Sequence, residues 1–318
     1  IRALVNLHSI DPASPVTRPA PSERPTDLLL LNASNYPRVP LYPYAFVQVS
    51  EVARRHGLRV ASVDLLGVPE QALRPKLADL VALHRPRAIG LHLRQLDSLF
   101  IEDYRGYLPR EGGPPAARPE ASFRPVEATQ RIASTLRELS DAPLLLGGHG
   151  FTSSPRAVFE RVRPDLGVVG EPDALFARFD DALAGRDRAS IPNLMFRGAD
   201  GVVTTPRVEQ GPAAGMEYTP AIIDEIKRFY GSPQLAAQTF SVELMRGCPY
   251  RCIHCSSNPT TRKEGKLIAP KTQRRYSPAY LDRLLGDLVR DIQRICIRII
   301  VLGQRRHQAA SRSGAASP

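Results

Sequence analysis

Within residues 1–190, short apolar runs alternate from Asp27 onward with stretches of helical periodicity, and this alternation restricts the fold more than any other feature of the chain. The first three runs end at Asn32, Val63 and Leu93, and two more follow. An amphipathic stretch separates each run from the next. Short joins of this kind favour parallel strands with helices on both faces of the sheet. The sequence therefore predicts an α/β fold whose N-terminal domain is a doubly wound, Rossmann-like parallel sheet.

The apolar periodicity, together with the Gly and Pro residues that interrupt it, gives approximate bounds for each strand and helix. The expected strands cover residues 27–32, 58–63, 87–93, 143–146 and 166–169. The expected helices cover residues 44–56, 70–84, 126–139, 154–163 and 172–184. Residues 191–238 carry scattered Pro and Gly with one helical patch at 220–230, so an irregular connecting segment is expected there.

Polar and glycine-rich loops follow the expected strands. In doubly wound sheets ligands bind at the carboxyl ends of the strands, and glycine lets the backbone approach a ligand closely. The run Gly147-Gly148-His149-Gly150 is by itself equally consistent with a tight strand-to-helix bend. The loops expected on this rim are Asn32–Tyr36, Asp64–Gly67, His92–Ser98, Gly147–Thr152 and Gly170–Pro172.

Three of the four cysteines, Cys248, Cys252 and Cys255, lie within eight residues and directly follow a short apolar run. Closely spaced thiolates on one loop suit an iron–sulfur cube, and three ligands leave one iron open for a bound molecule. The alternative is a zinc site completed by His254 or Cys296. His254 lies between two of the ligands, and Cys296 is most simply a buried apolar residue.

The excess positive charge is concentrated at one end of the chain. From Ser241 onward there are 15 Lys and Arg against 5 Asp and Glu, whereas residues 1–240 hold 28 against 27. A nearly neutral body with a basic end is more typical of a solvated surface than of a nucleic-acid stripe, so no nucleic-acid partner is expected. No run approaches the roughly 18 apolar residues of a membrane span, and no signal pattern is evident, so we expect a cytoplasmic protein without membrane contact.

Together the two halves resemble the cobalamin-binding-domain radical S-adenosylmethionine (SAM) family, methyltransferase type, over residues 27–302. The strand ending at Asn32 with its Tyr- and Pro-rich loop, the segment Gly147–Thr152, the pair Gly170-Glu171 and the cysteine motif carry the resemblance. Residues 28–49 and 92–98 further resemble tryptophan-methylating enzymes of thiopeptide biosynthesis.

The resemblance implies three cofactors, namely a [4Fe-4S] cluster, SAM and cobalamin. The cluster ligands would be Cys248, Cys252 and Cys255, and the open iron would bind the amino and carboxylate groups of SAM. No catalytic residue is assigned. The residues that the resemblance assigns to cofactor binding are Asn32, Arg94, Gly147, Gly148, Phe151, Thr152, Gly170, Glu171, Tyr250 and His254.

No D-x-H-x-x-G motif follows Asn32, so the resemblance implies base-off cobalamin without a histidine as lower ligand. The loop His92–Ser98 would then lie beneath the corrin. Arg94 is permanently cationic and a poor metal ligand, and would keep the lower face of cobalt free. The alternative is a surface arginine paired with Asp97. His92 is either a core or a rim histidine.

The implied activity is methyl transfer from SAM through methylcobalamin to an unactivated carbon of a small molecule or natural-product precursor. An electron donor such as flavodoxin or ferredoxin would be a partner. Two alternatives remain open, a rearrangement or ring-contraction enzyme using the same cofactors and a cobalamin-binding module without catalysis.

The C-terminal part departs from the family pattern. A radical SAM barrel of about six βα units needs on the order of 190 residues, whereas 79 remain from Phe240. We therefore expect a fragment or a frame-shifted product. In this interpretation residues 239–302 form the first part of a partial (β/α) barrel, and residues 303–318 are a disordered or out-of-frame tail.

Overall fold

The computed structural model describes most of the N-terminal part of the chain and a few short C-terminal segments. The described residues are 25–33, 44–65, 68–96, 124–208, 239–243, 245–246, 274–275, 278–279, 282, 286 and 298–302. The expected cluster loop, with its three cysteines, Tyr250 and His254, lies outside these residues.

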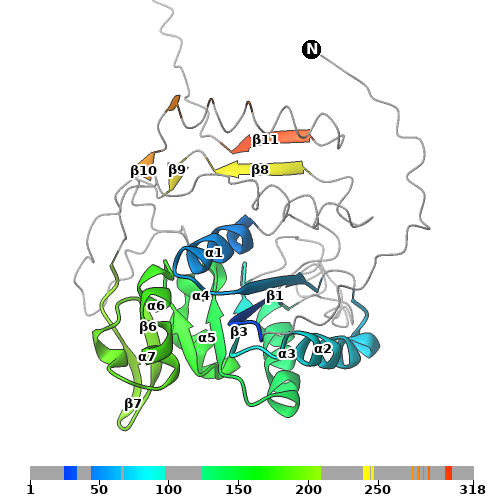
Figure 1. Ribbon diagram of the computed structural model, residues 1–318, viewed down its shortest axis with the longest axis vertical. Coiled ribbons are helices and arrows are strands. Elements are labelled where there is room, and N and C mark those ends of the chain that lie inside the picture. Colours follow the sequence, from blue (N-terminus) through cyan, green and yellow to red (C-terminus); the bar gives the residue numbers. More distant parts are fainter. Residues whose placement is uncertain are drawn as a thin grey trace, which may run out of the picture.

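A seven-stranded sheet forms the centre of the N-terminal part (Figure 1). The strand order is β2-β1-β3-β4-β5-β6-β7, with the first five strands parallel. This mostly parallel sheet confirms the expected α/β class. The strands are β1 (Leu28–Asn32), β2 (Val60–Asp64), β3 (Ala88–His92), β4 (Leu144–Gly147), β5 (Leu166–Val168), β6 (Leu194–Gly198) and β7 (Gly201–Thr204).

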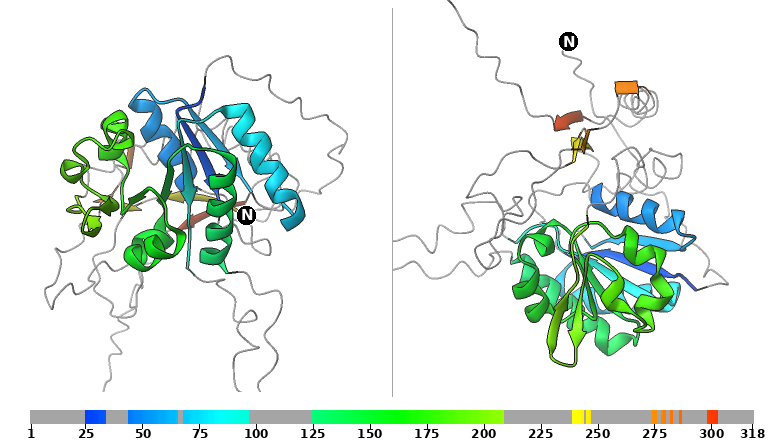
Figure 2. Two further views of the ribbon diagram at one scale, coloured as in Figure 1. Left: turned by 90° about the horizontal axis from the view of Figure 1, so that it is seen from below. Right: turned by 90° about the vertical axis from the view of Figure 1, so that its left-hand side faces the viewer.

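Helices cover both faces of the sheet (Figure 2). The packing follows the alternation of side chains along a strand: Leu28 and Leu30 of β1 face one core, and Leu29 and Leu31 face the other. α1 and the α6–α7 pair contribute to the first core, and α2, α3 and α5 to the second. The helices are α1 (Tyr44–Arg55), α2 (Glu70–His84), α3 (Pro125–Leu139), α4 (His149–Ser153), α5 (Pro155–Val162), α6 (Asp173–Ala177) and α7 (Phe179–Leu183).

Two local expectations were wrong. Residues 194–204, expected to be irregular, form β6 and β7, which pair antiparallel with each other and extend the sheet beyond β5. Their sequence pattern is weak because the strands are short. The strand form of β6 depends on its pairing with β5, and that of β7 on its pairing with β6. The single helix expected at 172–184 is two short helices that break at Arg178.

The described C-terminal strands form two small pairs. β8 (Thr239–Glu243) pairs in parallel with β11 (Arg298–Leu302), and β9 (Met245–Arg246) pairs antiparallel with β10 (Arg274–Arg275). A parallel pair of strands distant in sequence fits the first unit of a (β/α) barrel. Within the described part of the chain, no helix has both the length and the apolar character to cross a bilayer.

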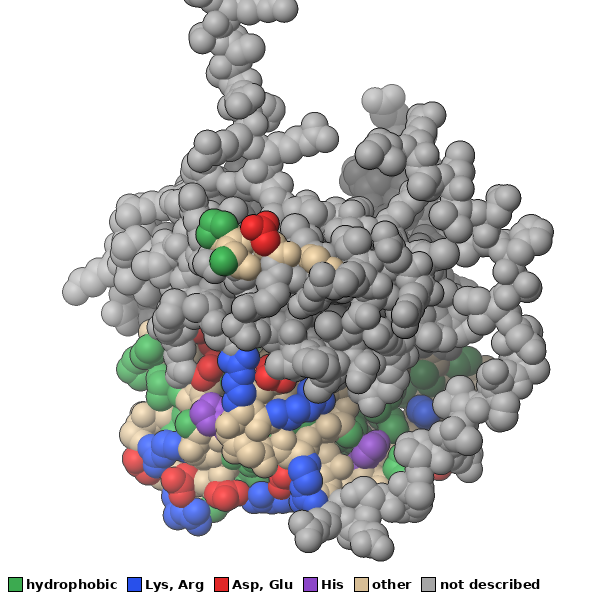
Figure 3. All heavy atoms as spheres, turned by 45° about the horizontal axis from the view of Figure 1, so that its top comes forward, with side chains coloured by type: hydrophobic (Ala, Val, Ile, Leu, Met, Phe, Trp, Pro, Cys, Tyr) green, Lys and Arg blue, Asp and Glu red, His purple; other side chains and the backbone are tan. Residues whose placement is uncertain are grey.

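Charged side chains are intermixed on the surface of the described part. On the face shown in Figure 3, Lys and Arg lie among Asp and Glu rather than forming a stripe. Several of them form ion pairs, such as Arg87 with Asp27 at 3.1 Å and Arg186 with Asp181 at 2.8 Å. The Arg186–Asp181 pair is exposed, and such pairs contribute little to stability. Asp27, in contrast, is buried, and its carboxylate also accepts a hydrogen bond from the amide of Arg59.

Candidate functional site

An apolar pocket lies on the face of the sheet that carries α1 and α6, near the carboxyl ends of β3 and β4. Alternation along the strands places Gly90 and Gly147 on this face, with Leu145 and His92 as their partners in the strand register. The lack of a side chain at Gly147 leaves room above the sheet, whereas the Leu30 side chain covers Gly90, where an added Cβ would lie 2.6 Å from Leu30 Cδ2. The pocket is lined by Leu28, Leu30, Val49, Gly90, Leu91, His92, Leu145, Leu146, Gly147, Gly148, Val168, Gly170, Pro172, Leu175 and Phe176.

A hydrogen-bonded chain of polar side chains crosses the ends of three adjacent strands beside this pocket. Asn32 is paired with Asp64 on one side and His92 on the other in the strand register. Its Nδ2 donates to Asp64 Oδ1 at 3.2 Å, and its Oδ1 lies 3.3 Å from His92 Nδ1. Because an amide oxygen only accepts, His92 must donate from Nδ1, which leaves the lone pair of the neutral ring on Nε2. The chain thus fixes one tautomer of a pocket-lining histidine.

The environment of His92 disfavours its charged form. Burial is the largest cause and lowers the pKa of the imidazole to about 4, with further lowering by the positive charges of Arg94 and His149. Burial also lowers the pKa of the Arg94 guanidinium from its ordinary value. An arginine remains charged at neutral pH even so. The rim therefore presents a neutral histidine next to a partly buried cation.

The neutral His92 should make the folded chain acid-sensitive. Its pKa is about 4 when folded, against the ordinary 6.5 expected when unfolded, so the unfolded chain binds the proton first as pH falls. Stability is therefore full well above pH 6.5 and declines as the pH falls towards 4, by about 3 kcal/mol in total. Urea unfolding across this range should show the decline in wild type and a flatter profile in His92→Gln. His56→Gln, which replaces an exposed histidine, should keep the wild-type decline; equal slopes in all three proteins would contradict the assignment.

Gly148 and Gly150 hold the loop after β3 against the start of α4. Gly148 has a φ of +105°, and an added Cβ would lie 2.4 Å from the carbonyl oxygen of Leu93. The amide of Gly150 donates to the carbonyls of Leu93 and Arg94, both at 3.0 Å. These contacts account for the need for glycine at both positions without a ligand. They agree with the alternative interpretation of this run, a tight strand-to-helix bend. Gly147 differs, since an added Cβ there meets nothing closer than 3.8 Å.

Thr152, Gly170 and Glu171 join the rim to the antiparallel extension of the sheet. The amide of Gly170 donates to Thr152 Oγ1 at 3.1 Å. The carbonyl of Glu171 accepts a hydrogen bond from Asn193 Nδ2 at 3.0 Å. Asn193 Nδ2 also donates to the carbonyl of Val208 at 2.9 Å, and the amide of Val208 donates to Asn193 Oδ1 at 2.7 Å. Of the three predicted residues, Gly170 lines the pocket, while Thr152 positions its backbone.

Phe151 lies away from the pocket. Its side chain is fully buried in the core on the opposite face of the sheet, where an added Cβ on Gly167 would lie 2.5 Å from its ring. The structure therefore brings Asn32, Gly147, Gly148 and Gly170 together at the pocket and its rim, with Arg94 close by in sequence to His92. It places Phe151 in a packing position.

Sequence reasoning did not single out several pocket residues. Val49 of α1 and Leu175 and Phe176 of α6 read as ordinary core positions, because a pattern of apolar residues does not reveal a gap between helices. Gly90 carried a signal, since glycine inside an apolar strand often marks a close approach of another group. Within the described residues, no group of three His, Cys, Asp or Glu is placed to hold a metal ion.

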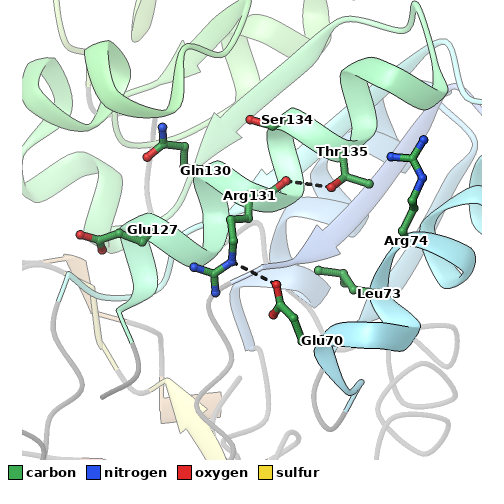
Figure 4. A pocket seen from close by; sticks show the side chains of 8 residues that line it. All are labelled: Glu70, Leu73, Arg74, Glu127, Gln130, Arg131, Ser134 and Thr135. Carbon is green, nitrogen blue, oxygen red and sulfur yellow. Dashed lines mark hydrogen bonds and ion pairs between the residues drawn. The ribbon is translucent and has the colours of Figure 1, made fainter. Parts of the chain in front are cut away.

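A second, shallow hollow lies between α2 and α3 and is polar (Figure 4). Arg131 Nε contacts Glu70 Oε1 at 3.2 Å, and Thr135 Oγ1 donates to the carbonyl of Arg131 at 3.0 Å. These side chains pair with one another on a solvated surface and point to no ligand. The lining residues are Glu70, Leu73, Arg74, Glu127, Gln130, Arg131, Ser134 and Thr135.

Comparisons with known proteins show which sequences and folds this chain resembles. No family model matches the sequence. Tryptophan 2-C-methyltransferase from Streptomyces laurentii is 26% identical over 168 residues, which are 52% of this chain and 25% of that enzyme. The radical SAM methyltransferase TsrM from Kitasatospora setae, solved with cobalamin and a [4Fe-4S] cluster, matches with a TM-score of 0.63 at 21% identity. Over these residues the chain is similar in sequence to a tryptophan 2-C-methyltransferase, and it shares its fold with a cobalamin-dependent radical SAM methyltransferase.

The solved relatives share the fold over most of this chain. The TsrM match covers 87% of the chain and 48% of TsrM. OxsB, a cobalamin-dependent SAM radical enzyme solved with aqua-cobalamin and SAM, matches with a TM-score of 0.57 at 18% identity, over 88% of this chain and 34% of OxsB. The chain thus spans about half the length of TsrM. The expected family resemblance is confirmed, including its tryptophan-methylating branch, at modest identity.

Proposed function

We propose that this chain binds cobalamin on its N-terminal sheet and contributes to SAM-dependent methyl transfer to an unactivated carbon of a small molecule. The observation that carries the proposal is the apolar pocket at the carboxyl ends of β3 and β4, next to the Asn32–Asp64–His92 chain. Ligands of doubly wound sheets bind at this edge. When bound, cobalamin supplies the methyl-carrying cobalt, and the cluster supplies the site for SAM.

The apolar character of the pocket supports binding of the planar, apolar end of a base-off cobalamin tail. Gly147 leaves room above the sheet, and leucines, among them Leu30 packed over Gly90, supply apolar walls together with Phe176. An added Cβ on Gly147 would make ordinary contact with Val168 at 3.8 Å, so a methyl group fits there, whereas a larger side chain would compete for the space of the pocket that Gly147 lines. An aromatic ring displaces water from such a surface at a gain that grows with the apolar area buried.

The rim supplies the polar side of the proposed site. Arg94 would lie under the corrin and keep the lower face of cobalt without a protein ligand, because a guanidinium does not coordinate metals readily. Burial and the charge of Arg94 would keep His92 neutral, and its contact with Asn32 would hold it in a single tautomer, so its Nε2 accepts a hydrogen bond instead of adding a second positive charge. Gly148 and Gly150 would hold the Arg94 loop in place.

The C-terminal residues would supply the radical SAM part. In this proposal residues 239–302 form the first part of the barrel, and Cys248, Cys252 and Cys255 hold the cluster with Tyr250 and His254 nearby. A low-potential electron carrier such as flavodoxin or ferredoxin would reduce the cluster. Tryptophan is the first substrate to test, because TsrM was solved with tryptophan and a SAM analogue bound.

Blocking the pocket tests cobalamin binding directly. Hydroxocobalamin should remain with the purified wild-type chain through gel filtration and show corrin absorption. Gly147→Leu should lower the affinity at least tenfold, because the new side chain occupies the pocket, whereas Gly147→Ala should change it little. Far-UV circular dichroism of both variants checks that the sheet is intact. Absence of corrin from the wild-type fraction would contradict the proposal.

A cobalamin-binding module without catalysis is the second candidate. The observation that favours it is that every residue of the described pocket belongs to the N-terminal sheet and its helices. Anaerobic reconstitution with iron and sulfide separates the two, since methylation of tryptophan or an analogue requires the cluster, while cobalamin retention does not. Retained corrin without methyl transfer would favour the binding module.

A further inference from the structure

Gln95 carries an unexplained buried amide. The residue is 8% exposed, and both Nε2 and Oε1 are enclosed with no hydrogen-bond partner in the described part of the chain. Leaving a buried donor or acceptor unpaired costs about 1–3 kcal/mol for each group. Native proteins rarely leave such groups without a partner, so a group that the chain itself does not contain is the natural candidate.

The position of Gln95 is fixed by the rim of the proposed cobalamin site. It follows Arg94 in the loop after β3, and that loop is held by the two hydrogen bonds from the amide of Gly150. The backbone of Gln95 packs so closely on Gly150 that an added Cβ would lie 2.8 Å from its carbonyl carbon. The amide is therefore presented from a rigid segment, which lowers the entropy lost when a ligand pairs with it.

We propose that Gln95 binds a primary carboxamide arm of the corrin ring through a reciprocal pair of hydrogen bonds. This assignment rests on the proposed function. Its unpaired donor and unpaired acceptor call for a partner that offers both, and a primary amide is complementary to another primary amide. The periphery of cobalamin carries such amides all round.

An adenine edge also offers a donor and an acceptor, so SAM is the other source of the same pairing. The corrin is favoured because Gln95 directly follows Arg94, and His92 of the same strand end lines the pocket assigned to cobalamin. The cluster and its SAM belong to the C-terminal residues in the proposed function. The two sources can be distinguished. If Gln95 binds the corrin, a variant at Gln95 weakens cobalamin binding and leaves SAM binding unchanged, and if it binds the adenine, the reverse holds.

The test replaces Gln95 by methionine, which has nearly the same shape without the amide. Gln130→Met, on α3 at the polar hollow away from the pocket, is the matched control (Figure 4). The Kd for hydroxocobalamin should rise about tenfold in Gln95→Met, and the Kd for SAM on the reconstituted chain should not change. The thermal midpoint of the ligand-free variant should equal or exceed that of wild type, because an unpaired buried amide has been removed.

Each other outcome has a defined meaning. A fall in the thermal midpoint of ligand-free Gln95→Met with unchanged cobalamin affinity would show a structural role and overturn the assignment. A loss confined to SAM would assign the amide to the adenine and also overturn it. If wild type itself binds no cobalamin, the proposed function fails and this inference with it; if wild type binds and Gln95→Met binds equally, only the inference fails.

Discussion

Simultaneous replacement of Cys248, Cys252 and Cys255 by alanine is expected to abolish the iron–sulfur centre. After anaerobic reconstitution with iron and sulfide, wild type should hold about four iron and four sulfide per chain, and the triple variant almost none. Three thiolates that share one loop bind a cube together, so the loss should be complete rather than graded. Colorimetric iron and sulfide analysis and the broad cluster absorption measure it.

The remaining cysteine provides the control for this experiment. Cys296→Ala should keep the full iron content, because Cys296 is expected to be a small apolar residue and not a ligand. The triple variant should still retain hydroxocobalamin, since the pocket belongs to the N-terminal sheet. Zinc in the anaerobically prepared wild type, or loss of metal in Cys296→Ala, would support the zinc alternative.

Alanine at Gly148 is expected to lower the free energy of unfolding by about 3 kcal/mol. The residue has a φ of +105°, which side chains rarely adopt, and the added Cβ would meet the carbonyl oxygen of Leu93 at 2.4 Å and the ring of His92 at 2.8 Å. Because the nearest atom belongs to the backbone, relief requires the strand end and its loop to move. Urea unfolding of the ligand-free chain measures the loss.

The neighbouring glycine is a matched comparison. Gly147→Ala adds the same methyl group one residue earlier, without a positive φ and with no atom nearer than 3.8 Å, so its effect should stay within about 1 kcal/mol. Gly148→Ala should in addition weaken cobalamin binding, because the loop that carries Arg94 and Gln95 shifts with Leu93. Equal stability losses in the two variants would refute the close contact described here.

Much of the architecture was predictable because it depends on local patterns. Apolar runs such as Leu28–Asn32 and the glycine and proline breakers gave all five parallel strands to within a few residues. The antiparallel hairpin β6–β7 was not predictable, since Gly201–Thr204 is mostly exposed and its strand form depends on its partner β6. The break at Arg178 similarly depends on packing.

The candidate site likewise has features that the sequence predicts and features that depend on tertiary contacts. The sequence alone determined the parallel α/β class, the rim on which Asn32, Arg94 and Gly147 lie, and the cysteine spacing, because strand order of this type brings the strand ends to one edge. Only the tertiary structure decided that Asn32 contacts Asp64 and His92, residues 32 and 60 positions away. It also placed Phe151 in the core and left the amide of Gln95 unpaired. Register between distant strands and the identity of buried neighbours are non-local, and no spacing along the chain encodes them directly.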